Sequence, residues 1–259
     1  MPEQPAAAVR VTVWNEHLSE RREPAAARAY PRGLHVEVAG AIRELLGDAA
    51  AVRTATLDQP GQGLPAALLD ATDVLVWWGH LAHERVTDRT VARVRARVLA
   101  GMGLVALHSA HLSKVFVSLM GTSCNLSWRE GEDRELLWTV SPSHPIARGV
   151  PHPLQLGPHE MYGEFFDIPP PDELVFVSSF SGGEVFRSGC CFQRGAGRIF
   201  YFSPGHETQP VYRLPGVRRV LANAVAWAHN PAPPAIVPAA SERRPAGWFG
   251  AQPPPATDG

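Results

Sequence analysis

Residues 73–83 read DVLVWWGHLAH, a short apolar run followed by a polar turn. The apolar residues 74–78 have the length of a strand that is buried on both faces, and Gly79 and His80 end it. Residues 103–111, GLVALHSAH, repeat the pattern and place His108 directly after a second apolar run. Two such runs joined by a helix are typical of parallel strands in an α/β sheet.

The segments on either side continue this alternation. Thr87 or Asp88 can cap a helix between the two runs, since apolar residues then recur every three to four positions. Further strands are expected at residues 9–14, 52–57, 136–140, 173–180, 184–193 and 198–204, and further helices at residues 38–47 and 217–228. The segment between Glu20 and Gly33 is too irregular for one helix. It is either a lid or a contact between subunits of a homo-oligomer.

We therefore expect an α/β fold in which a mostly parallel sheet carries helices on both faces and a mixed, partly antiparallel extension. Residues 9–230 would form a single domain. Residues 1–8 would be a flexible N-terminus, and residues 231–259 a Pro/Ala-rich, disordered tail. Ligands of such sheets bind beyond the carboxyl ends of the strands, so the turns after the apolar runs are the expected site.

The composition narrows the classes of partner. The chain has 45% hydrophobic and 19% charged residues and a net charge of −1, which argues against nucleic acid or a membrane surface as partner. Neither a signal peptide nor a membrane span is visible. The cysteines Cys124, Cys190 and Cys191 are odd in number and form no disulfide framework, so we expect a cytoplasmic protein.

Histidines gather at the predicted edge of the sheet. His80 and His83 form one HxxH pair and His108 and His111 another, while His17 follows the first strand. Neutral imidazoles are good ligands for zinc or manganese. The predicted metal site consists of His17, His80, His108 and His206. The alternative is that one histidine of each pair caps a helix or is satisfied in the core.

Two later motifs can carry acid–base chemistry. His206 and Glu207 follow an apolar strand, as a base and a carboxylate would, although an ordinary polar turn has the same pattern. Glu160 and Glu164 lie in HEMYGE, where Gly163 favours a loop. One of two nearby carboxylates can act as the acid and the other as the base. The alternative is that this motif is a solvated acidic turn.

Aromatic and polar side chains at these turns could bind a sugar. Trp77, Trp78, Trp128 and Tyr162 offer flat rings for stacking, although tryptophans at strand ends are more often core. The predicted substrate-binding residues are Trp14, Asn15, Trp78, His83, His111, Tyr162 and Glu164.

Other catalytic classes lack their motifs. Ser109 is not in a G-x-S-x-G elbow, and Cys124 follows no strand of the required kind. The chain has neither a P-loop nor a GxGxxG after a strand, so no nucleotide cofactor is indicated.

Long blocks of the chain resemble the ThuA-like (trehalose-utilisation) proteins. These blocks include VTVWNEH, DVLVWWGHLAHERV, HSAHLSKVFVSLMGTSCNLSWRE, HEMYGEFFDIP and RIFYFSPGHET, and they extend from about Val11 to Asn230. The resemblance implies a flavodoxin-like sheet related to class I glutamine amidotransferases. In those enzymes a cysteine occupies the strand-to-helix elbow, where this chain has His108. Their late histidine and glutamate are matched by His206 and Glu207. Without the cysteine, glutamine hydrolysis is not expected.

The resemblance also implies a role in carbohydrate metabolism, on trehalose-type disaccharides or their 3-keto derivatives. His108 and His206 would act at the reacting atoms, and Glu160 or Glu207 would move protons. A divalent metal, zinc or manganese, would assist them if the histidine site binds one. The reaction would be an isomerisation, elimination or hydrolysis. The alternatives are a non-catalytic sugar-binding or regulatory protein and, ranked last, release of ammonia from glutamine by a cysteine.

Overall fold

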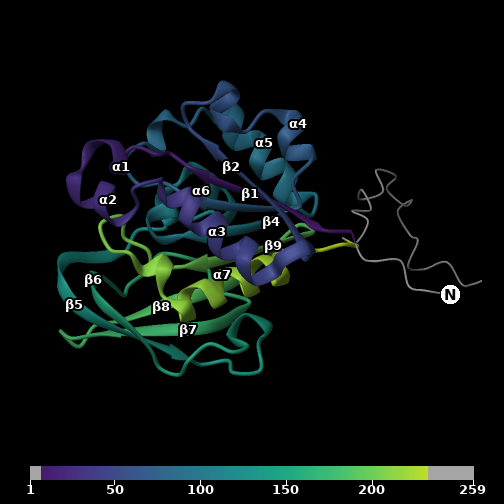
Figure 1. Cartoon of the computed structure of the whole chain (residues 1–259). Coiled ribbons are helices and arrows are strands. Elements are labelled where there is room, and N and C mark those ends of the chain that lie inside the picture. Colours follow the sequence, from purple (N-terminus) through teal and green to yellow (C-terminus); the bar gives the residue numbers. More distant parts are fainter. Residues whose placement is uncertain (1–6, 233–259) are drawn as a thin grey trace, which may run out of the picture.

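The computed structural model describes residues 7–232, and these residues build one nine-stranded sheet (Figure 1). The strand order is β2-β1-β3-β4-β9-β8-β7-β5-β6. Nearly all of the predicted N-terminal segment 1–8 and of the predicted tail 231–259 lies outside the described residues. None of the helices in residues 7–232 is long and apolar enough to cross a bilayer.

The parallel half of the sheet contains the strands that the apolar runs predicted. Its members are β1 (Val9–Asn15), β2 (Ala50–Thr56), β3 (Val74–Trp78), β4 (Gly103–Leu107) and β9 (Gly197–Phe202). Every residue of β3 and β4 is buried, because helices cover both faces. Their carboxyl ends lie side by side, with Asn15 beside Trp78 and Trp78 beside Leu107.

The antiparallel half extends the sheet from β9. It consists of β5 (Ser127–Thr139), β6 (Leu154–Gly163), β7 (Glu173–Phe180) and β8 (Val185–Arg194). Gly182 and Gly183 form the tight turn between β7 and β8, as predicted. Figure 1 shows this half below the parallel strands. The predicted mixed extension is confirmed.

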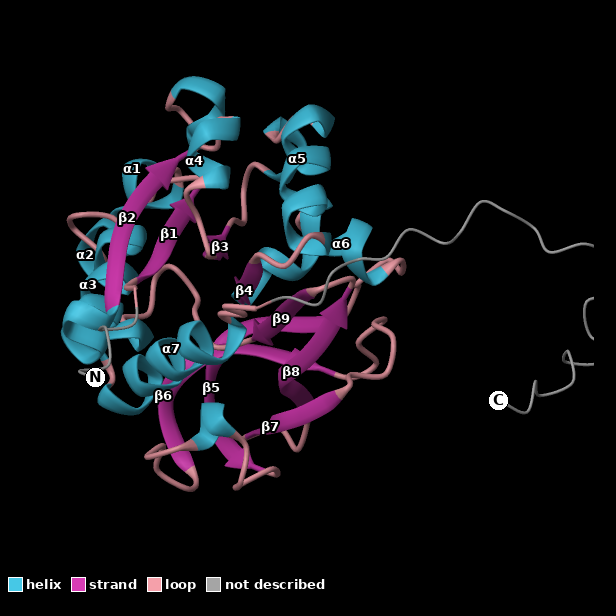
Figure 2. Ribbon diagram, turned by 90° about the vertical axis from the view of Figure 1, so that its right-hand side faces the viewer, coloured by secondary structure: helices cyan, strands magenta, loops and turns pink. Residues whose placement is uncertain are grey.

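Helices pack on both faces of the parallel strands (Figure 2). On one face α3 (Leu34–Leu46) and α7 (Pro215–Ala228) enclose a core with the odd-numbered valines of β1. On the other face, α4 (Ala66–Asp70), α5 (Asp88–Leu99) and α6 (Lys114–Met120) pack on Trp14, Leu75 and Trp77. Successive strand residues therefore enter different cores.

Two local predictions were wrong. Residues 159–164 were expected in a loop because of Gly163, but residues up to Gly163 belong to β6, which pairs with β5. The helix expected at residues 38–47 begins four residues earlier, at Leu34. The irregular segment between β1 and α3 folds as two short helices, α1 (Ser19–Arg22) and α2 (Pro24–Ala29).

Candidate active site

The turn after β4 places His108 at the carboxyl edge of the sheet. His108 begins a 3-10 helix, His108–Leu112, and has a φ of 52°, which is uncommon for a residue other than glycine. The next side chain ties this turn to β3, because Ser109 Oγ donates to the carbonyl of Gly79 at 3.0 Å. A sparsely populated backbone conformation held in this way is typical of functional sites.

Both ring nitrogens of His108 lie close to oxygen atoms. Nδ1 lies 2.7 Å from the carbonyl of Ser203, and Nε2 lies 3.1 Å from Oε2 of Glu160. Complete burial opposes a charge on this imidazole, but the Glu160 carboxylate and the Ser203 carbonyl raise the pKa of His108 above its usual value. We therefore assign His108 as an imidazolium paired with an ionised Glu160.

The pKa of Glu160 shifts in the opposite direction to that of His108. Burial by itself would raise the pKa of this carboxyl group, yet the contact with His108 dominates and lowers the pKa to about 2. Protonation of His206 or His80 would lower this pKa further. Glu160 is thus a carboxylate that stays ionised although it is only 8% exposed.

Tyr162 forms the wall beside this pair. Its ring stacks on the imidazole of His108 with 4.8 Å between ring centroids, and its hydroxyl lies 3.2 Å from His108 Nε2. Burial raises the pKa of Tyr162 well above its usual value, so the hydroxyl keeps its proton. His111 stands edge-on to the same ring, and burial lowers its pKa to about 3.

Two adjoining hollows open onto Glu160, and each has a volume of about 360 Å³. His80, Glu130 and Glu160 line both of them. The first hollow is also lined by Glu23, His206 and Glu207, and the second by His111, Trp128 and Tyr162. His108 is 0% exposed and lies behind Glu160. A bound molecule therefore meets the carboxylate and not the imidazole behind it.

His206 brings a neutral imidazole to the same hollow. Burial and the charge on His108 lower the pKa of His206. Its Nδ1 accepts from the backbone N–H of Thr208 at 3.3 Å, which leaves the hydrogen on Nε2. Glu207 lies between two histidines, 3.8 Å from the Nε2 atoms of both His206 and His80. The predicted His206–Glu207 motif does lie in the same hollow as Glu160.

A residue without an assigned role, His159, holds this turn in place. Its Nε2 accepts from the backbone N–H groups of Gly205 and His206, at 3.1 and 3.3 Å. Its Nδ1 lies 3.0 Å from the carbonyl of Glu160 and 3.3 Å from Oε2 of Glu135. Burial lowers the pKa of His159 to about 3, so the ring is neutral and links β6 to the turn.

We expect His159→Leu to lower the free energy of unfolding by about 1–3 kcal/mol, because two buried N–H groups lose their acceptor. His159→Gln, whose side-chain oxygen can accept one of these bonds, should recover part of that loss. Urea unfolding of the two variants measures the difference. Equal stability of His159→Leu and the unaltered protein would show that the bonds contribute nothing.

The predicted four-histidine metal site is not formed. His80 and His206 line one hollow with Glu160, whereas His108 lies behind that carboxylate. His17 lies elsewhere, against His35, with 4.8 Å between the ring centroids. Among the described residues the groups that could hold a metal ion are Glu130 with Glu160 and His206, and His17 with Glu20 and His35.

The prediction that Trp14 and Trp78 bind a sugar was wrong, because each is 1% exposed. Trp14 stacks on Trp77 with 3.9 Å between ring centroids, within the core. The indole N–H of Trp78 donates to the carbonyl of Gly205 at 3.0 Å and so supports the His206 turn. Trp128, by contrast, is 61% exposed and lines the second hollow.

Three other predicted substrate-binding side chains lie away from the hollows. Glu164 forms an ion pair of 2.8 Å with Arg187. The amide of Asn15 donates to Glu20 at 2.8 Å. His83 is half-buried, and burial lowers its pKa to about 4. Only His111 and Tyr162 of the predicted set line a hollow.

The sequence prediction missed Glu130, which lines both hollows. It lies in the charged run WREGEDRE, which reads as a solvated turn. The structure brings it near Glu160 because β5 and β6 pair with a register shift between Arg129 and Asp133. No spacing rule could have found this contact.

The cysteines are poorly suited to nucleophilic attack. All three are free and buried. Burial raises the pKa of Cys124 to about 11 and that of Cys190 to about 12, and it raises the pKa of Cys191 still further. A thiol that holds its proton so strongly is a weak nucleophile.

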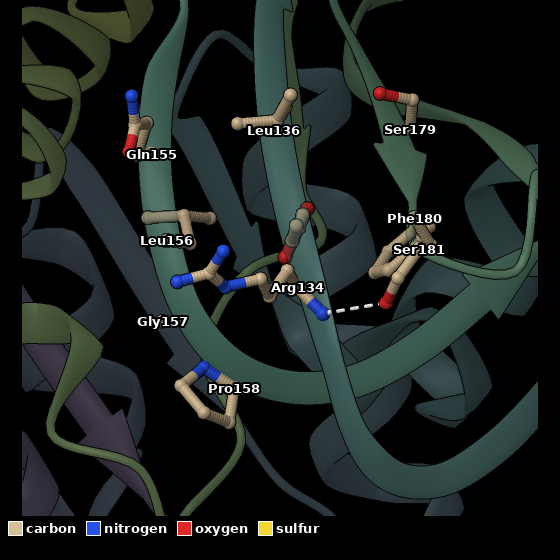
Figure 3. A pocket seen from close by; sticks show the side chains of 10 residues that line it. Arg134, Leu136, Gln155, Leu156, Gly157, Pro158, Ser179, Phe180 and Ser181 are labelled. Carbon is tan, nitrogen blue, oxygen red and sulfur yellow. Dashed lines mark hydrogen bonds between the residues drawn. The ribbon is translucent and has the colours of Figure 1, made fainter.

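A larger cavity of about 580 Å³ lies on the antiparallel half (Figure 3). Residues of β5, β6 and the end of β7 line it, among them Arg134, Leu156 and Phe180. Its lining contains no histidine, and its carboxylate, Glu135, is 1% exposed and engaged with Ser178. The acid–base groups gather at the two smaller hollows instead.

A family model described as trehalose utilisation (ThuA) matches residues 10–228. A ThuA-like protein of Parabacteroides merdae is similar with a TM-score of 0.63 and 15% identity, over 90% of this chain and 94% of that chain. A ThuA-like protein of Bacteroides uniformis has a TM-score of 0.62 and 16% identity, over 88% and 95%. A cytoplasmic protein of Salmonella typhimurium has a TM-score of 0.56 and 13% identity, over 85% and 99%.

At these identities the structural likeness shows the fold alone, and it confirms the predicted flavodoxin-like α/β class. The comparison with curated proteins finds no match.

Proposed function

Since this chain belongs to the trehalose utilisation (ThuA) family, we propose that it is an enzyme of carbohydrate metabolism that acts on trehalose-type disaccharides or their 3-keto derivatives. The observation that carries the proposal is Glu160, an ionised carboxylate at the floor of both hollows with a neutral His206 beside it. We place the enzyme in the cytoplasm, where free, buried cysteines stay reduced.

The proposed step is removal of a proton next to a carbonyl group. Glu160 takes the proton from the carbon beside the keto group. The electron pair of that C–H bond forms a carbon–carbon double bond, and the π pair of the carbonyl group moves to its oxygen, which gives an enediolate. The Nε2–H of His206 donates to that oxygen. A carboxylate that is ionised at neutral pH can accept such a proton, and the N–H of a neutral imidazole can donate to the oxygen on which negative charge develops.

The intermediate can then react in two ways. Transfer of the hydroxyl proton to the former carbonyl oxygen, with return of the proton from Glu160 to the former carbonyl carbon, gives an isomer. Expulsion of the glycosidic oxygen, which takes the electron pair and acquires a proton, splits the disaccharide. Positive charge on His108, behind Glu160, favours the anionic intermediate in either route.

His108 itself has a positioning role in this proposal. It keeps Glu160 ionised and fixes its direction, because its other nitrogen is held by the carbonyl of Ser203. This changes the predicted assignment, in which His108 acted directly on the substrate. Trp128 and Tyr162 would supply the flat surfaces for sugar rings.

A divalent cation in this pocket would be held by Glu130, Glu160 and His206, whose ligand atoms lie within 4.8 Å of one another. Carboxylate and imidazole ligands suit zinc or manganese. Such an ion would take the place of the His206 Nε2–H in stabilising negative charge on the enediolate oxygen, because Nε2 cannot bind a metal and donate a hydrogen bond at once.

Deuterium exchange tests the proposed step without requiring that the final product be known. In D₂O, the protein should catalyse the exchange of hydrogen for deuterium at the carbon beside the keto group of 3-keto-trehalose. NMR of the sugar follows this exchange. Glu160→Gln should lower the rate by about 10²–10⁴-fold, because the amide cannot take the proton. Glu173→Gln, an exposed change far from the hollows, is the matched control.

Saturable binding of the sugar by calorimetry, with exchange no faster than in buffer, would contradict the enzyme. It would support the alternative, a non-catalytic sugar-binding or regulatory protein.

A further inference from the structure

A second cluster of metal-binding side chains lies away from the Glu160 hollows, where β1 ends. His17 and Glu20 come from the turn after β1 and from α1, and His35 comes from the first turn of α3. Their candidate ligand atoms all lie within 4.8 Å of one another. Glu20 and His35 are buried, at 8% and 7% exposure, while His17 is half-buried.

The carboxylate of Glu20 has one oxygen that is satisfied and one that is not. Oε1 accepts from the side-chain amide of Asn15 at 2.8 Å and from the backbone N–H of Leu34 at 2.6 Å. Oε2 is buried and has no hydrogen-bond partner. Leaving a buried carboxylate oxygen without a donor is costly unless a cation or a proton donor meets it.

The residues around the cluster hold it open. Asn15 is fixed in direction, because its Oδ1 accepts from the backbone N–H of His17 at 2.8 Å. Gly33 leaves room for the imidazole of His35, since a Cβ there would lie 2.5 Å from His35 Cε1. Outer groups that orient a carboxylate and make space for an imidazole are typical of metal sites.

We propose that His17, Glu20 and His35 bind a zinc ion. Two imidazoles and one carboxylate match the ligands that zinc prefers, and three protein ligands leave a fourth position for water. A tetrahedral zinc ion separates its ligand atoms by about 3.4 Å, so the half-buried His17 closes the site by a small rotation.

The site joins β1, α1 and the start of α3, and so fixes the segment that borders the first hollow. Glu23, just after α1, lines that hollow, and the hydroxyl of Tyr30 donates to the carbonyl of Gln209 on the opposite wall at 2.6 Å. These contacts make the segment part of the pocket wall, and its two expected roles, a lid or a subunit contact, stay predictions. Bound zinc would stabilise this segment by linking β1, α1 and the start of α3.

Zinc content and thermal unfolding of the full chain test the proposal. The protein, purified without a histidine tag and loaded with zinc, should retain a zinc ion that Glu20→Gln and His35→Gln lose. Glu130→Gln should still retain it, because Glu130 belongs to the other cluster. Zinc at about 100 times its Kd should raise the Tm by roughly 5–10 °C, and neither Glu20→Gln nor His35→Gln should show the shift.

His17→Asn removes the half-buried ligand and leaves the buried side chains of Glu20 and His35 in place. Asparagine tolerates the φ of 52° at this position, so the backbone should not change. It should lose zinc while circular dichroism stays unchanged. Zinc retained by both Glu20→Gln and His17→Asn, zinc lost only in Glu130→Gln, or no zinc binding by the unaltered protein would each overturn the proposal.

Discussion

We expect His108→Asn to slow the exchange of 3-keto-trehalose at acidic pH, by roughly tenfold for each pH unit below the raised pKa of Glu160, while the protein remains folded. Asparagine tolerates the φ of 52° at this position, but it cannot carry the positive charge that keeps Glu160 ionised. Burial would then raise the pKa of the Glu160 carboxyl group, opposed only by the smaller effects of His206 and His80. The measurement is the exchange rate of the purified variant.

The pH profile separates this role of His108 from a merely structural one. In the unaltered protein the pKa of Glu160 is lowered to about 2, so the rate should not fall on the acid side between pH 8 and pH 4. In His108→Asn the pKa should lie above the usual 4.5, so the rate should fall as the pH decreases through that value. His152→Asn, an exposed change, should keep the original profile. A slow His108→Asn variant with an unshifted profile would contradict the proposed pairing.

Glu135 should make the protein less stable as the pH rises. Burial raises the pKa of this carboxyl group from 4.5 to about 7 in the folded state. The folded chain then binds a proton that the unfolded chain has lost. The resulting stabilisation is fully present below pH 4.5 and disappears as the pH rises through 7. The loss is on the order of 3 kcal/mol at pH 8, because each pKa unit corresponds to about 1.4 kcal/mol.

Glu135→Gln should remove this dependence, because an amide resembles the protonated acid and does not titrate. In urea unfolding, the variant should gain about 3 kcal/mol relative to the unaltered protein between pH 4.5 and pH 8. Glu132→Gln is an exposed change in the same strand. Its free energy of unfolding should differ from that of the unaltered protein by a nearly constant amount over this pH range. A constant difference for Glu135→Gln as well would mean that Glu135 is ionised throughout, in an ion pair with the nearby His159.

Local pattern was enough to predict the parallel half of the sheet. The apolar runs at residues 74–78 and 103–107 are β3 and β4, because a strand covered on both faces needs apolar residues at every position. The strand assignment also predicts that His80, His206 and Glu207 lie near one another, because each comes shortly after the end of a parallel strand. Turns after parallel strands meet at one edge of the sheet.

The partners of these residues could not be predicted in the same way. His108 pairs with Glu160, 52 positions later, and Glu160 comes from β6, which the sequence suggested was a loop. Pairing of β5 with β6 across a register shift brings Glu130 to the same hollow. Contacts between distant strands depend on register, and no periodicity within one segment records it.

Burial was the other quantity that only the tertiary structure decided. Trp14 and Trp78 stand at strand ends, where a ring can face either a ligand or a helix, and the packing of helices on both faces placed them in the core. The same packing moved His17 away from the other predicted ligands and toward Glu20 and His35. The sequence alone determined the fold class and the edge of the sheet that carries the site, because both follow from short-range apolar pattern. Which side chains meet there, and which of them stay ionised, depends on distances and desolvation that exist only after the chain has folded.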